Sequence, residues 1–124
     1  MRVLVVSEHQ VVRQRAASML RARPAVEIVD AATAHDAKRL LVDETFDVLV
    51  VDGDLAPQGG FSFLYEFHQQ AEQDGLTTPP AIVLTARSED RWLADWAHAA
   101  TTLPKPVDPF AVAKTVDSLT AANT

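Results

Sequence analysis

The chain has 124 residues, a length typical of one domain, and 48% of them are hydrophobic, so a sizeable core is expected. Its formal charge of −6 argues against a nucleic-acid-binding surface, and the lack of cysteine excludes disulfides and thiolate chemistry. No apolar stretch approaches the roughly 18 residues of a membrane span, so we expect one cytoplasmic domain over residues 1–124, without an output domain and with a fraying tail over residues 120–124.

Strands and helices alternate along the chain. Short aliphatic runs predict five strands, at residues 3–6, 26–31, 47–51, 81–84 and 101–103; the second is weaker and the fifth is short. Apolar residues at helical spacing predict a helix after each strand, at residues 11–23, 34–43, 61–73, 88–99 and from 109 onward. In the last helix, Asp108 is placed to cap the first turn and Pro109 suits the first helical position. Its sheet-facing side chains are expected to be Phe110, Ala113, Val116 and Leu119.

Five strand–helix units in succession predict an α/β fold. Right-handed crossovers between the strands give a parallel five-stranded sheet with helices on both faces. Periodicity does not define the strand order, but the number and length of the units suit the flavodoxin-like order 2-1-3-4-5.

Polar residues follow four of the five strands. They are Ser7 and Glu8 after the first, Asp52, Gly53 and Asp54 after the third, Thr85 after the fourth and Lys105 after the fifth. The carboxyl ends of parallel strands share one edge, so these side chains are expected to lie close together. An aspartate can act as a nucleophile, carboxylates can hold Mg²⁺, and a lysine can neutralise a transferring group. The pattern therefore favours phosphoryl transfer onto a carboxylate.

Over nearly its whole length the chain resembles the receiver domain of two-component response regulators. The matching motifs are the strand that runs from Phe46 into Asp52, the Gly60-Phe61 step, Leu84-Thr85-Ala86 and Lys105-Pro106. The resemblance implies that Asp52 is the phosphoacceptor, that Thr85 is the switch hydroxyl and that Lys105 contacts the phosphoryl group. It also implies a Mg²⁺ site made by Glu8, Asp52 and the backbone carbonyl of Asp54, and a cis Lys105–Pro106 peptide bond.

The same resemblance implies a signalling role without turnover catalysis. A sensor histidine kinase or a phosphotransfer protein would phosphorylate Asp52, and an unidentified protein target would bind the phosphorylated form. The protein is expected to be a monomer or a weak homodimer. Two alternatives stay open: a degenerate receiver that acts as a constitutive interaction module, and, more remotely, an Asp-x-Asp phosphatase.

Several residues depart from the receiver pattern. Ser7 stands where receivers carry the first of two acidic residues, which lowers the expected metal affinity. Thr102 stands where many have an aromatic switch residue, and His98 replaces a common glycine. The four histidines (His9, His35, His68 and His98) show no metal-ligand spacing and are interpreted as surface or packing residues.

Two tryptophans lie on the predicted fourth helix. Trp92 and Trp96 are four residues apart and would share one helix face. Trp92 is expected in the core, whereas Trp96, together with Thr102, is a candidate for the output face that binds a partner.

Overall fold

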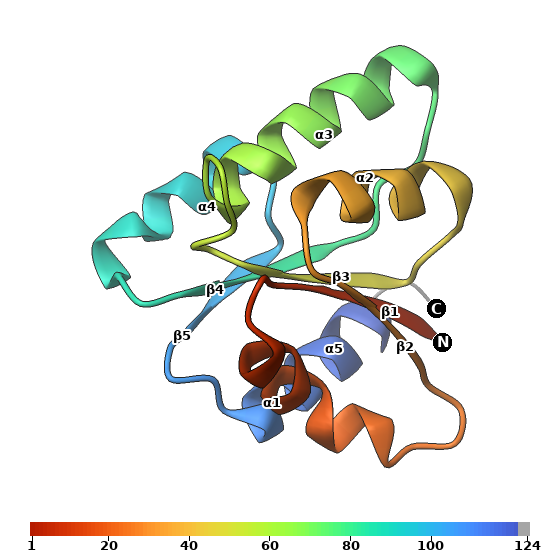
Figure 1. The fold of residues 1–124 in the computed structure, drawn as a ribbon, viewed down its shortest axis with the longest axis vertical. Helices are drawn as coiled ribbons and strands as arrows, with labels where there is room; N and C mark the ends of the chain where they lie inside the picture. The colour runs from red at the N-terminus through yellow and green to blue at the C-terminus, as the bar shows by residue number, and fades with distance from the viewer. Residues whose placement is uncertain (122–124) are drawn as a thin grey trace.

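The computed structural model describes residues 1–121, without the side chains of Ser88 and Glu89. Its elements in chain order are β1 (Arg2–Val6), α1 (Gln10–Arg21), β2 (Glu27–Ala31), α2 (Ala34–Asp43), β3 (Val48–Asp52), α3 (Gly60–Asp74), β4 (Ala81–Thr85), the 3₁₀ helix η1 (Ser88–Trp92), α4 (Leu93–Ala97), β5 (Thr101–Pro104) and α5 (Pro109–Ala121) (Figure 1). Of the predicted tail, residues 120 and 121 belong to α5, and residues 122–124 lie outside the described part.

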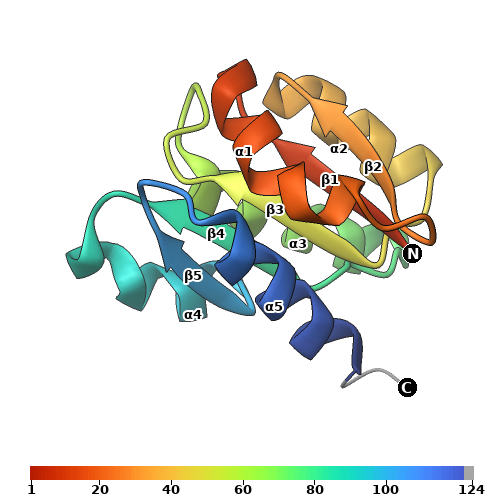
Figure 2. The ribbon, with the colours of Figure 1, turned by 90° about the horizontal axis from the view of Figure 1, so that it is seen from below.

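The five strands form one parallel sheet in the order β2-β1-β3-β4-β5, which confirms the predicted fold. Helices α1 and α5 cover one face, and α2, α3 and α4 cover the other (Figure 1). Strands β2 and β5 form the two edges, and β3 lies in the middle (Figure 2).

Two apolar clusters flank the sheet. On β1, Leu4 and Val6 belong to the cluster beneath α2 and α3, whereas Val3 and Val5 belong to the cluster beneath α1 and α5. A strand buried on both faces has no polar side to show, so its sequence is a continuous aliphatic run. This double burial accounts for the aliphatic sequences of β1, β3 and β4.

Local signals define several helix ends. The Thr33 side chain accepts a hydrogen bond from the Asp36 backbone N–H at 3.1 Å and caps α2. Asp108 Oδ1 accepts one from the Phe110 N–H at 2.9 Å and so caps α5 as predicted. Gly75, with φ of 69°, ends α3 in the left-handed conformation that glycine adopts without strain.

Two predictions about burial are wrong. The predicted fourth helix begins with a 3₁₀ turn and is α-helical only over Leu93–Ala97, so helical spacing does not apply across it, and Trp92 is 68% exposed. Phe110 is 66% exposed. It lies in the first turn of α5, where helical side chains lean toward the N-terminus, while Val107 fills the core at that end.

No helix within residues 1–121 combines the length and the apolar character needed to cross a bilayer.

Candidate functional site

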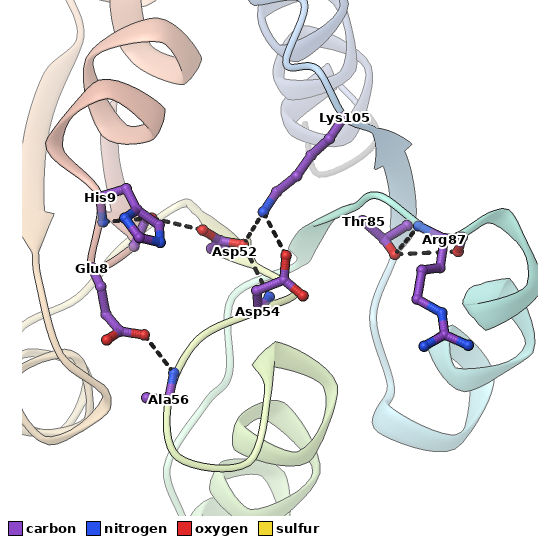
Figure 3. A network of polar contacts seen from close by, with 9 residues as sticks. Glu8, His9, Asp52, Asp54, Ala56, Thr85, Arg87 and Lys105 are labelled. Atoms are coloured by element: carbon purple, nitrogen blue, oxygen red, sulfur yellow. Dashed lines mark hydrogen bonds and ion pairs between the residues drawn. The ribbon is translucent and has the colours of Figure 1, made fainter.

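Asp52 ends the central strand β3 and is 1% exposed. Three donors surround its carboxylate (Figure 3). Lys105 Nζ and the Asp54 backbone N–H donate to Oδ1 at 2.5 Å and 3.0 Å, and Ser7 Oγ donates to Oδ2 at 2.7 Å. Each donor comes from a different loop, so the carboxylate joins the ends of β1, β3 and β5.

This environment keeps Asp52 ionised. Burial alone would raise the pKa of its carboxyl, but the hydrogen bonds from Lys105, Asp54 and Ser7 outweigh it, and the pKa lies below its ordinary value. Burial would likewise lower the pKa of the Lys105 ammonium, but the two carboxylates it contacts raise it. Both partners are therefore charged near neutral pH, as a carboxylate nucleophile and a cationic neighbour require.

Lys105 lies in the loop between β5 and α5, and its side chain is 18% exposed. Besides Asp52, its Nζ donates to Asp54 Oδ2 at 3.0 Å, so one ammonium serves two carboxylates. The Lys105–Pro106 peptide bond is cis, as the resemblance implied. Asp54 thus has a side-chain contact in the site, in addition to the backbone role expected for it.

Glycines let the loop after β3 approach its neighbours closely. The Gly53 N–H donates to the Leu84 carbonyl at 2.7 Å, and a Cβ on Gly53 would lie 2.7 Å from that same oxygen. A Cβ on Gly60 would collide with the Asp52 carbonyl oxygen. These backbones cannot give way cheaply, so residues without a side chain are required at both positions.

Ser7 is a site residue whose role the sequence analysis missed. It is 1% exposed, follows β1, and bonds to Asp52 through its hydroxyl. Val6 pairs with Val51 in the sheet, so the next residues, Ser7 and Asp52, stand side by side. Once the pairing of β1 with β3 is known, the sequence predicts that Ser7 lies next to Asp52.

The Glu8 carboxylate points toward Ala56 and not toward Asp52 (Figure 3). Its Oε1 accepts a hydrogen bond from the Ala56 backbone N–H at 2.8 Å and ties the loop after β1 to the loop after β3 (Figure 3). Within the described residues, no group of three or more His, Cys, Asp or Glu side chains is gathered as a metal site. Glu8, Asp52 and the Asp54 carbonyl are nonetheless hard oxygen donors, the kind that Mg²⁺ takes. These donors are chemically suited to Mg²⁺. To bind the ion, Glu8 has to break its hydrogen bond with the Ala56 N–H.

Thr85 ends β4 and is 8% exposed. Its hydroxyl donates to the Arg87 carbonyl and accepts from the Arg87 N–H, both at 3.2 Å, and so is engaged with the turn that leads into η1 (Figure 3). The Thr85 carbonyl accepts from the Lys105 N–H at 2.9 Å, which links the two strand ends.

The two residues of the predicted output face lie on different elements. Trp96 on α4 is 42% exposed and stacks on Tyr65 of α3, with ring centroids 4.4 Å apart and planes 5° from parallel. Thr102 lies half-buried on the edge strand β5, opposite Val83. Trp96 therefore packs against α3 through one ring face.

Known proteins share this fold and this sequence pattern. Residues 3–117 match the family described as "Response regulator receiver domain". The "Uncharacterized response regulatory protein" of Mycobacterium tuberculosis is 33% identical over 127 residues, covering 98% of this chain and 92% of the relative.

Solved receiver structures superpose closely. The receiver domain of Saccharomyces cerevisiae Ssk1, crystallised with the histidine phosphotransfer protein Ypd1, gives a TM-score of 0.88 at 18% identity, covering 99% of this chain and 90% of that one. The chemotaxis response regulator CheY4 of Vibrio cholerae gives 0.81 at 24% identity, with coverage of 95% and 97%. With the family match over nearly the whole chain, these findings place the protein in the response regulator receiver domain family.

Proposed function

We propose that Asp52 accepts a phosphoryl group from a sensor histidine kinase or a phosphotransfer protein, and that the phosphorylated domain binds a protein target differently. The observation that carries this proposal is the buried, ionised Asp52 carboxylate with Lys105 Nζ 2.5 Å from its Oδ1. The protein is then a signalling domain whose only chemistry is phosphorylation and dephosphorylation of itself.

In the proposed transfer, a carboxylate oxygen of Asp52 bonds to phosphorus as the phosphorus–nitrogen bond to the donor histidine breaks. Lys105 lies where its ammonium can offset charge on the phosphoryl oxygens. Glu8, Asp52 and the backbone carbonyl of Asp54 would hold Mg²⁺. When bound, this ion would neutralise charge and orient the phosphoryl oxygens. Thr85 would contact the phosphoryl group after its hydroxyl turns away from Arg87.

Intact-mass measurement tests the proposal. The protein is incubated with Mg²⁺ and acetyl phosphate, a small phosphodonor, in parallel with Asp52→Asn. We expect one added phosphoryl group on the wild type and none on the variant. An adduct of equal yield on Asp52→Asn would contradict the assignment of Asp52. Steady release of phosphate from simple phosphomonoesters would point instead to a phosphatase.

A second candidate is a constitutive interaction module. Two contacts favour it: Ser7 supplies a neutral donor where a metal-binding acid would stand, and Glu8 is bonded to Ala56. On this account no adduct forms, and Mg²⁺ does not change the tryptophan fluorescence.

Either function needs a partner surface, and we place it around Trp96 and Thr102. A cytoplasmic location and a monomer or weak homodimer go with the proposal. Trp96→Ala should weaken target binding and leave phosphorylation intact, because Trp96 belongs to α4 and not to the Asp52 pocket.

A further inference from the structure

Two histidines that are far apart in the sequence lie together at the seam between α3 and α4. His68 belongs to α3, and His98 directly follows α4 in the left-handed conformation, with φ of 61°. Their ring centroids are 5.1 Å apart, and the ring planes are tilted by 44°. Sequence spacing could not reveal this pair, because its members are thirty positions apart.

The separation matches a shared metal ion. Two imidazoles bound to one tetrahedral zinc ion, each with a Zn–N distance of about 2.1 Å, have ring centres about 5.2 Å apart. A tilted arrangement lets each ring direct one nitrogen at a common point, whereas parallel stacking does not.

The surroundings of His68 suit a ligand. Thr78 Oγ1 lies 3.3 Å from His68 Nδ1. Metal-bound histidines characteristically donate their second N–H to such a partner, which orients the ring and leaves Nε2 for the metal.

The pair opens onto a hollow that holds further oxygen donors. The hollow measures about 440 Å³, and its lining includes Tyr65, Gln69 and Glu72 as well as the two histidines. The described residues contain no group of three His, Cys, Asp or Glu side chains gathered for a metal. Water would therefore complete the coordination, and the chain's net charge of −6 favours a cation.

We propose that His68 and His98 form a binding site for a divalent transition metal, of which zinc is the representative, that fastens α4 to α3. Imidazole pairs suit Zn²⁺, Cu²⁺ and Ni²⁺ and not Mg²⁺. The site is separate from Asp52 and does not depend on phosphorylation. A bound metal would link α3 to the C-terminal end of the five-residue helix α4, close to the Tyr65–Trp96 stack, and so hold the two helices together.

Calorimetric titration with zinc chloride tests the site, using the full chain at pH 7.5. We expect one Zn²⁺ bound by the wild type and at least a tenfold loss of affinity in both His68→Ala and His98→Ala. Thr78→Ala should weaken binding by about tenfold, because it removes only the orienting partner. His35→Ala, a change at an exposed histidine on α2, should bind as the wild type does.

Several results would overturn the site. They are the absence of Zn²⁺ binding by the wild type, unchanged binding by the double variant His68→Ala/His98→Ala, and equal losses in His35→Ala. Circular dichroism of each metal-free variant checks that it is folded. Cu²⁺ should also quench tryptophan fluorescence more strongly in the wild type than in the double variant, since Trp96 lies beside the hollow on Tyr65. Equal quenching would count against the site.

Discussion

Charge at the carboxyl end of β3 is distributed unevenly. The Lys105 ammonium contacts Asp52, and the second carboxylate on that ammonium belongs to Asp54, whose side chain is 70% exposed. On the opposite side Ser7 donates a neutral hydroxyl to Oδ2. The Asp52 carboxylate thus has three hydrogen-bond donors from protein groups, although one ammonium is shared between two carboxylates.

Ser7→Asp should lower the stability of the metal-free protein and raise its affinity for Mg²⁺. A carboxylate next to Asp52 repels it, so the variant should melt at a lower temperature than the wild type without metal. Mg²⁺ should restore the loss, adding about 2.7 kcal/mol when its concentration is a hundred times Kd. Thermal melts with and without MgCl₂ measure the effect.

Ser7→Ala is the matched control. It removes the hydrogen bond that Ser7 Oγ donates to Asp52 and the one it accepts from the His9 N–H. Losing the buried bond to Asp52 costs about 1–3 kcal/mol. The variant adds no ligand, so Mg²⁺ should stabilise it no more than the wild type. An equal Mg²⁺ response in Ser7→Ala and Ser7→Asp would show that position 7 does not control the metal.

The ionisation of Asp52 should make stability depend on pH. Its pKa is lowered in the folded protein relative to the ordinary 3.8, so its contribution to the free energy of unfolding is present above pH 3.8 and is lost as the pH falls through the folded-state value. Urea unfolding between pH 7 and pH 3 should show this loss.

Lys105→Met should change that pH profile. Removing the ammonium leaves a buried carboxylate with two neutral donors, which should cost about 3–5 kcal/mol at pH 7. The pKa of Asp52 should rise, so acidification should destabilise the variant less than the wild type. A profile parallel to the wild type would mean that Lys105 does not set the pKa of Asp52.

The sequence predicts which residues belong to this site better than it predicts which atoms their side chains contact. Asp52, Lys105 and the cis bond before Pro106 could be inferred because strand ends and motifs mark them. The orientation of Glu8 toward Ala56 and of Thr85 toward Arg87 depends on side-chain rotation, which leaves no trace in a pattern of residue types.

Among the elements, the start of α3 is the most tightly constrained. Gly60 begins this helix, and its missing side chain lets the helix approach the backbone of β3. A methyl group there would meet the Asp52 carbonyl and also lie 2.9 Å from Val51 Cγ1. The helix and Asp52 are therefore coupled through a backbone contact.

Gly60→Ala should destabilise the fold by about 1–3 kcal/mol through overpacking, and should slow phosphorylation because Asp52 must shift. Gly75→Ala is the control. A Cβ added at Gly75 would meet no non-neighbouring heavy atom within 4 Å, so this variant loses only about 1 kcal/mol to its left-handed backbone and its phosphorylation should be normal. Urea unfolding and intact mass measure both effects, and a normal phosphorylation rate in Gly60→Ala would reject the coupling.

The helices also show where periodicity fails as a guide. It identified Ala113 and Val116 of α5 correctly, because both lie under the middle of a regular helix. It failed for Trp92, since η1 interrupts the α-helical spacing, and for Phe110, which lies in the first turn of α5 and is 66% exposed. Both errors occur at an end of an element, where local geometry replaces the repeat.

At the scale of the whole molecule, one sheet contributes side chains to two hydrophobic clusters, one on each of its faces. Leu20 of α1 and Leu64 of α3 are buried in different clusters on opposite faces of that sheet. Neither face could remain ordered if the strands separated, so both clusters should unfold together.

Leu20→Ala and Leu64→Ala should each lower the free energy of unfolding by about 2–5 kcal/mol, with coincident transitions by tryptophan fluorescence and far-ultraviolet circular dichroism. The denaturant slope should match that of the wild type. Separate transitions for either variant would mean that the two faces unfold independently.

The two edge strands are also protected against intermolecular pairing. On β2, Glu27 and Asp30 carry charge along the open edge and bond to Arg2 and Arg21 at 3.1 Å and 2.8 Å. Strand β5 has four residues and ends in a proline, which has no N–H to donate. Charged or very short edges resist the addition of a foreign strand, so a concentrated solution of this protein should be poorly disposed to amyloid-like growth.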